Sequence, residues 1–133
     1  MATLNSTLTL ASTDLTSDVL SLTTTASFTC SHTSGIARKA ITSTAIGTAS
    51  GQVTLDTADE FGSPSIIYIK NTHAYHESNN FIYCYFSGDA DGLPIQIAGG
   101  QFAYIPLTSD FTLKAYTSTS GTIVEFCVFG TLA

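Results

Sequence analysis

The sequence is short of charged side chains, and of positive ones above all. Only 11% of the 133 residues are charged, well below the roughly 25% of ordinary soluble domains. Four lysine and arginine residues stand against ten acids, the formal net charge is -6, and only Arg38 and Lys39 are adjacent. A phosphate-binding face needs clustered basic residues. We therefore expect no nucleic acid partner.

Long hydrophobic runs are also missing. No apolar stretch approaches the roughly 18 residues of a membrane span, so no membrane partner is expected. The first residues, MATLNSTLTLASTD, have neither a basic start nor a continuous apolar segment, and so do not resemble a signal peptide. We expect synthesis in the cytoplasm.

Cysteine is scarce as well. The three cysteines, Cys30, Cys84 and Cys127, are odd in number and have no CxxC spacing, which argues against a disulfide framework or a zinc ribbon. Cys84 and Cys127 lie inside the apolar runs FIYCYF and VEFCVF, where cysteine is typically a small buried residue. We predict free thiols, and one disulfide between any two of the three is the alternative.

The residues that are present are those of β-sheets. The chain has 6 Tyr, 8 Phe and many Thr, Ile and Val, which pack well on a pleated surface. From residue 64 onward, short apolar runs alternate with segments rich in turn residues. Predicted strands cover residues 65–70, 81–86, 93–97, 101–107, 111–117 and 122–129. Their close spacing leaves no room for helical crossovers, so we expect antiparallel pairing.

The first half is less periodic and richer in Thr and Ser. Strands are predicted over 6–12, 18–25, 27–31, 40–46 and 52–57, with turns at 34–39 and 48–52. A helix over Leu15 to Leu22, capped by Thr13 or Asp14, is the rival interpretation.

The predicted fold class is all-β, an antiparallel β-sandwich of jelly-roll type. A chain of this length holds one core, so residues 1–133 should form a single domain, with residues 1–25 as an N-terminal arm or as its first strands. A closed barrel is the alternative for eight or more antiparallel strands.

The segment AGGQFAYIPL, residues 98–107, predicts a tight turn beside an aromatic strand. Gly99 and Gly100 can adopt positive φ, so the strand at 95–97 is predicted to reverse into a hairpin with 101–105. Pro106 donates no hydrogen bond and should end the pairing, at an edge or strand end. Phe102 and Tyr104 share one face, turned toward the core or toward a partner.

Catalytic and metal motifs are weak. His73, His76 and Glu77 provide at most a partial zinc set. The segment 89–92, Asp-Ala-Asp-Gly, begins like a calcium loop but lacks the later acidic ligands. Neither a nucleophile elbow nor a local nucleophile–base pair is present. We expect no enzymatic activity, no catalytic residue, no metal and no cofactor.

The C-terminal half resembles small structural proteins of tailed bacteriophages, including marine phages and cyanophages. The resemblance covers about residues 64–130 and rests on the order SIIYIKNT, FIYCYF, PIQIAGGQFAYIPL and DFTLKAYTSTSGTIVEFCVFG. The Thr-rich N-terminal half is similar to the starts of such proteins, more weakly. These proteins include capsid decoration, or cement, proteins of jelly-roll type.

The resemblance implies a virion protein on the outer surface of the capsid, made in the host cytoplasm, with the major capsid protein as its partner. A small chain with exposed apolar surface is expected to bury it by self-association, and a seat at threefold positions of a capsid would make it a homotrimer. The predicted interface residues are Phe102, Tyr104 and Tyr116.

Two other virion roles are alternatives. One is a receptor- or carbohydrate-binding β-domain of a tail fibre, with aromatic side chains stacked on sugar rings. The other is a head–tail connector or base protein. Candidate sugar-stacking residues are Tyr75, Tyr83, Tyr85 and Tyr116.

Overall fold

The computed structural model describes residues 1–15, 18–42, 44, 53–56, 61–74, 80–86, 95–107 and 112–132. Over these residues the chain is all-β and its sheets are antiparallel, as the sequence predicts. The described ranges contain no helix long and apolar enough to cross a membrane. The chain forms two compact units, residues 1–31 and residues 32–133.

The first unit is a two-stranded antiparallel ribbon. Strand β1 (Ala2–Ser12) pairs with β2 (Leu20–Cys30) along its whole length, from Ala2 opposite Cys30 to Ser12 opposite Leu20. Both strands consist largely of Thr, Leu, Ser and Ala, without glycine or proline to interrupt the pairing. At the turn, the Ser12 hydroxyl donates to Asp14 Oδ1 at 2.9 Å. We call this unit the ribbon.

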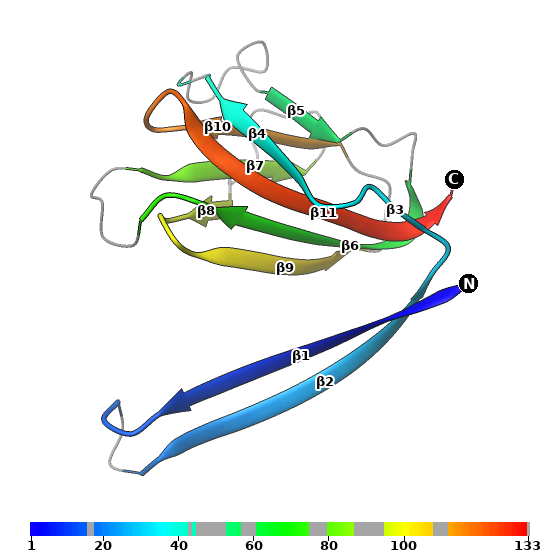
Figure 1. Cartoon of the computed structure of the whole chain (residues 1–133), viewed down its shortest axis with the longest axis vertical. Helices are drawn as coiled ribbons and strands as arrows, with labels where there is room; N and C mark the ends of the chain where they lie inside the picture. Colours follow the sequence, from blue (N-terminus) through cyan, green and yellow to red (C-terminus); the bar gives the residue numbers. More distant parts are fainter. Residues whose placement is uncertain are drawn as a thin grey trace. The chain divides into compact units, whose positions relative to one another are not determined.

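The second unit contains two sheets (Figure 1). The five-stranded sheet contains β3 (His32–Thr33), β4 (Ala37–Ile41), β6 (Phe61–Asn71), β9 (Phe102–Leu107) and β11 (Thr122–Leu132). The four-stranded sheet contains β5 (Val53–Asp56), β7 (Ile82–Phe86), β8 (Ile95–Ile97) and β10 (Leu113–Thr117). The strand orders are β3-β11-β6-β9, with β4 also beside β11, and β5-β10-β7-β8. Strand β11 is therefore central to its sheet.

One hydrophobic core lies between the two sheets. Alternate residues of β6 and β11 point into it, because successive side chains on a strand point to opposite faces. The buried core cluster takes Ile41, Ile67, Ile69, Val124, Phe126 and Val128 from one sheet and Ile82, Cys84, Ile97, Leu113 and Ala115 from the other. The second unit is thus a β-sandwich. The jelly-roll topology stays a prediction.

The predicted hairpin between 95–97 and 101–105 is wrong. Strand β8 pairs with β7, whereas β9 pairs with β6 in the other sheet, so the chain crosses between sheets at Gly99 and Gly100. The turn itself is present: Gln101 N donates to Ala98 O at 3.0 Å, and Gly100 has φ of 75°. A Cβ on Gly99 would lie 2.5 Å from the backbone oxygen of Ala74, so only glycine fits there.

Asn71, at the end of β6, joins the segments that meet at this crossing. Its buried amide nitrogen donates to Asn80 O at 2.8 Å and to Ile97 O at 3.1 Å. Its amide oxygen accepts from His73 N at 3.1 Å. The backbone of Asn71 also bonds to Gln101 O and Gly100 N. One side chain therefore connects β6, β8 and the residue that lies two positions before β7.

Three local predictions in the first half need correction. Leu20 to Leu22 lie in β2, so the rival helix is wrong, and the two strands predicted at 18–25 and 27–31 are one continuous strand. The turn predicted at 34–39 is replaced from Ala37 onward by β4. Residues 48–52, the other predicted turn, lie outside the described residues.

Pro106 lies on the outermost described strand of its sheet, as predicted for a residue that cannot donate to the ladder. It does not end the pairing, because Leu107 still pairs with Ser65.

Candidate binding surface

The outer face of the five-stranded sheet carries a group of aromatic side chains. The register pairs Tyr68 of β6 with Tyr104 of β9, and Lys70 with Phe102. Paired residues of an antiparallel sheet share a face, and Ile67 and Ile69, on the opposite face of β6, lie in the core. Tyr68, Phe102 and Tyr104 therefore point away from the core. We call these three residues the aromatic face.

Two members of the aromatic face are exposed to solvent. Phe102 is 60% exposed and Tyr104 is 39% exposed. The rings of Tyr68 and Phe102 lie 6.4 Å apart at an angle of 39°, within the range of favourable aromatic contacts. Exposed large apolar side chains gathered on a rigid sheet are typical of an interaction surface.

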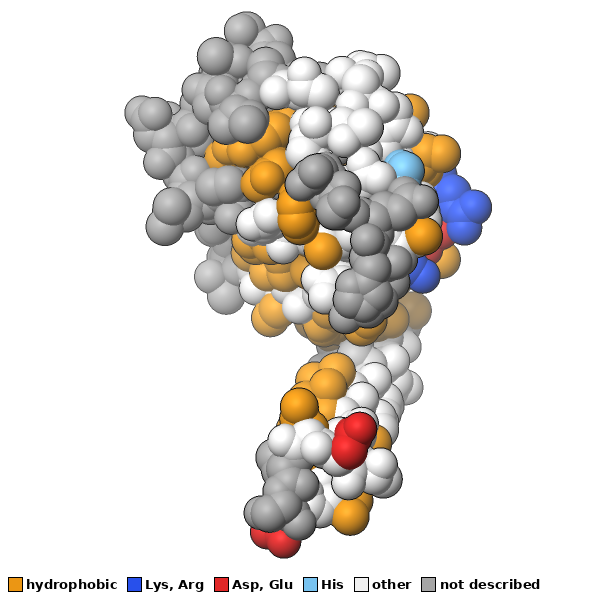
Figure 2. Space-filling model, turned by 90° about the vertical axis from the view of Figure 1, so that its left-hand side faces the viewer, with side chains coloured by type: hydrophobic (Ala, Val, Ile, Leu, Met, Phe, Trp, Pro, Cys, Tyr) orange, Lys and Arg blue, Asp and Glu red, His pale blue; other side chains and the backbone are white. Residues whose placement is uncertain are grey.

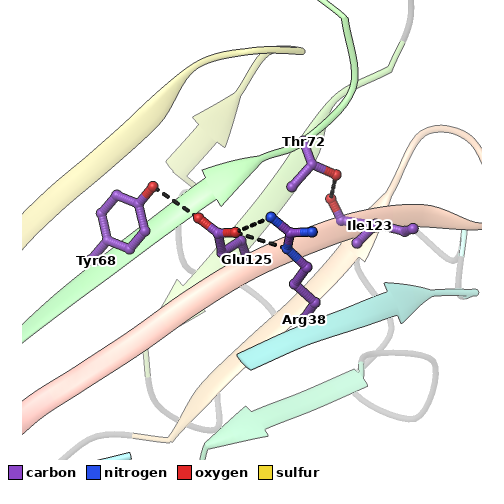
Figure 3. A network of polar contacts seen from close by, with 5 residues as sticks. All are labelled: Arg38, Tyr68, Thr72, Ile123 and Glu125. Atoms are coloured by element: carbon purple, nitrogen blue, oxygen red, sulfur yellow. Dashed lines mark hydrogen bonds and ion pairs between the residues drawn. The ribbon is translucent and has the colours of Figure 1, made fainter. Parts of the chain in front are cut away.

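A polar network borders the aromatic face (Figure 3). Glu125 of β11 lies between Arg38 of β4 and Tyr68 of β6. Its Oε2 accepts from Arg38 Nε and pairs with Nη2, both at 2.8 Å, and its Oε1 accepts from the Tyr68 hydroxyl at 3.3 Å. The Glu125 side chain is only 15% exposed, whereas that of Arg38 is 70% exposed. The carboxylate is thus held in place and the guanidinium faces solvent.

The network also sets the ionisation of its members. The hydrogen bond from Arg38 lowers the pKa of Glu125, which therefore stays ionised at neutral pH. Burial, and next the charge of Glu125, raise the pKa of Tyr68, which stays protonated. Because the pKa of Glu125 is lowered by folding, the pair contributes its stabilisation above the ordinary glutamate pKa and loses it as the pH falls through the lowered value.

This arrangement is suited to binding. It offers apolar ring faces, a fixed carboxylate and an exposed guanidinium, all presented by paired strands. In the described part of the chain, no three His, Cys, Asp or Glu side chains come close enough to hold a metal ion. Most of the predicted zinc and calcium segments, including His76, Glu77 and residues 89–92, lies outside the described residues.

The structure separates the three predicted interface residues. Phe102 and Tyr104 lie together on β9, whereas Tyr116 lies on β10 in the other sheet and is 2% exposed. The Tyr116 ring stacks on Tyr83 at 4.6 Å and on Tyr85 at 5.4 Å. Burial raises the pKa of Tyr116 above the ordinary tyrosine range. Tyr116 therefore supports packing, and we withdraw it from the predicted interface.

The tyrosines suggested for sugar stacking are also mostly inaccessible. Tyr85 and Tyr116 are buried, and Tyr83 is half-buried. Tyr75 lies outside the described residues.

Sequence reasoning missed the members of this surface that lie far apart in the chain. Tyr68, Arg38 and Glu125 come from three strands, and the pairing of β11 with both β4 and β6 brings them together. The sequence held one signal: Glu125 alternates with the core residues Val124 and Phe126, which places it on the opposite face of the strand. Spacing along the chain does not show which strands become neighbours in the sheet.

All three cysteines are free, as predicted, and Cys30 is buried together with Cys84 and Cys127, for which burial was predicted. Burial raises the pKa of the Cys84 thiol to about 12, so this group stays protonated and unreactive near neutral pH. We expect a reducing agent to leave the melting temperature unchanged, and a thiol reagent to react much more slowly with the native protein than with the unfolded one. Thermal melts with and without reductant check the first point. A fall of several degrees on reduction would reveal a disulfide.

Searches against protein-family models, curated proteins and solved structures found no match to this chain.

Proposed function

We propose that the chain is a structural protein of a bacteriophage virion, a decoration or cement protein on the outer surface of the capsid. The sequence resemblance of residues 64–130 supports the phage origin. The observation that carries a binding role is the exposed aromatic face on the five-stranded sheet. The partner is then the major capsid protein, and the protein is made in the host cytoplasm before it joins the virion.

The aromatic face is the proposed contact with the capsid. Aromatic side chains form the centre of many protein interfaces because they bury a large area with few rotatable bonds. Phe102 and Tyr104 would form such a centre, and Arg38 would lie at its polar rim. The proposed assembly is a homotrimer at threefold positions, in which several modest contacts act together.

Truncating the aromatic face should weaken capsid binding. The double variant Phe102→Ala, Tyr104→Ala loses two exposed rings without leaving a core cavity, so we expect a normal fold and an affinity at least roughly tenfold weaker, a loss of about 1.4 kcal/mol or more. Co-sedimentation with capsids that lack the protein measures this. The control Ile36→Ala removes an exposed apolar side chain outside the aromatic face and should bind like the wild type.

A receptor- or carbohydrate-binding domain of a tail fibre is the second candidate function. The observation in its favour is the fixed Glu125 carboxylate bonded to Tyr68, whose ring contacts that of Phe102, since sugars are bound by ring stacking combined with charged hydrogen-bonding groups. A protein that ignores capsids yet binds host-surface glycans, and loses this binding in the Phe102→Ala, Tyr104→Ala variant, would establish this function instead.

A further inference from the structure

The ribbon has two chemically different faces. The β1–β2 register places cross-strand partners on a common face. One face carries nine apolar residues among twelve: Ala2, Leu4, Leu8, Leu10, Leu20, Leu22, Ala26, Phe28 and Cys30, with Ser6, Ser12 and Thr24. The other face carries Thr, Ser and Asn at nine of ten positions, with Ala11 as the exception. We call the first the apolar face of the ribbon.

Much of the apolar face is solvent-exposed. Leu8 and Leu10 are each 45% exposed and Leu22 is 47% exposed. Figure 2 shows exposed hydrophobic side chains on the ribbon. The eleven paired positions extend over about 37 Å. A continuous apolar strip of this length on one side of a polar ribbon is typical of a surface that another sheet covers.

Two strands alone also make a poor independent unit. An isolated hairpin is marginally stable at best in water, and three or more strands with a shared hydrophobic face are needed for stability. Packing against the ribbons of other copies would raise the number of strands, to six in the proposed homotrimer. The ribbon therefore gains the most from a partner that brings a β-sheet with an apolar face of its own.

The chemistry of the ribbon points to a second copy as that partner. Neither strand contains a charged residue, and the acids of this unit, Asp14 and Asp18, lie in the segment between the strands. An apolar face without charged residues cannot form ion pairs with a basic or acidic partner. It can pack on an identical face without burying an unpaired charge, as the cores of homo-oligomeric interfaces do.

We propose that the ribbons of neighbouring copies of this chain pack with their apolar faces together and hold the oligomer. The Thr-rich faces then point to water. This inference rests on the self-association in the proposed function and assigns it to the ribbon, apart from the aromatic face. If oligomers form through the ribbon but do not bind capsids, the decoration role is wrong and the inference about the ribbon still holds.

The test is the solution mass of the full chain by light scattering. We expect an oligomer for the wild type. Leu10→Thr with Leu22→Thr replaces a cross-strand pair of the apolar face by a residue that also favours strands. We expect this variant to dissociate to monomers, with a dissociation constant at least roughly tenfold higher. The control Thr9→Val with Thr23→Val changes the cross-strand pair next to it, on the opposite face, and should keep the wild-type mass.

Two further measurements keep the proposal falsifiable. All six tyrosines lie in residues 32–133, so an unchanged near-UV circular dichroism signal shows that the sandwich of the variant still folds. Hydrogen exchange of wild-type ribbon amides should slow as the protein concentration rises. The proposal would be overturned by a monomeric wild type or by an apolar-face variant that keeps the oligomer mass. It would also be overturned if the hydrogen exchange of the ribbon did not depend on protein concentration, because the ribbon would then be protected within its own chain.

Discussion

Replacing Asn71 with leucine is expected to lower the free energy of unfolding by ~3 kcal/mol or more, because each buried polar group left unpaired costs about 1–3 kcal/mol. The change removes the two amide donations to Asn80 O and Ile97 O and the acceptor for His73 N. Leucine has a similar volume, so the loss would come from the unpaired groups. For a unit of this size, the melting temperature should fall by roughly 12 °C or more.

Chemical denaturation and thermal melts measure this effect. The matched control is Gln96→Leu, because Gln96 is an exposed amide in β8, one residue before Ile97. Surface changes of this kind usually stay within about 0.5 kcal/mol. Equal stability of Asn71→Leu and Gln96→Leu would show that the crossing does not depend on the Asn71 side chain.

The second large effect is expected for Gly99→Ala. The new Cβ would lie 2.5 Å from the Ala74 backbone oxygen, closer than real Cβ contacts, so the backbone of one segment must move. Forced overpacking of this kind costs about 1–3 kcal/mol, and we expect a value near the upper end because the neighbour is backbone. Equilibrium denaturation gives the number.

Gly35→Ala provides the comparison for Gly99→Ala. Gly35 has φ of 70°, but a Cβ there would meet nothing within 4 Å. Gly35→Ala therefore carries the cost of a left-handed backbone, roughly 1–2 kcal/mol, without any close contact, whereas Gly99 has no positive φ and its substitution carries the close contact alone. A cost of Gly99→Ala below about 0.5 kcal/mol, the range of ordinary surface changes, would show that the close approach to Ala74 does not constrain the fold.

The strands were predictable because their signal is local. Alternation of apolar and polar residues from 65 to 129 predicts β-structure, and the structure has β6 to β11 there. Which strands become neighbours was not predictable in the same way. The segment AGGQ has the composition of a hairpin turn, yet it connects two sheets, since β8 pairs with β7 and β9 pairs with β6. The residues of a turn determine the local bend of the chain, whereas tertiary contacts determine which strands pair.

The same limit applies to the candidate binding surface. Parity within a strand correctly places Phe102 and Tyr104 on one face, but it contains no information about the sheet that holds Tyr116. The sequence of the ribbon, although rich in Thr, does predict a strand with one apolar face. Leu20, Leu22, Ala26 and Phe28 occupy every second position except Thr24, which is the spacing of a strand with one apolar face.

The central position of β11 affects how the protein folds during synthesis. The ribbon can pair once the first thirty or so residues are made, since its partners are close in sequence. The five-stranded sheet cannot, because β3, β4 and β6 all pair with residues 122–132. While the ribosome is still making the chain, the edges of β4 and β6 that will receive β11 are open to other nascent chains. Much of the sandwich therefore forms only after β11 has been synthesised. Misassembly competes with folding during the time before β11 is available.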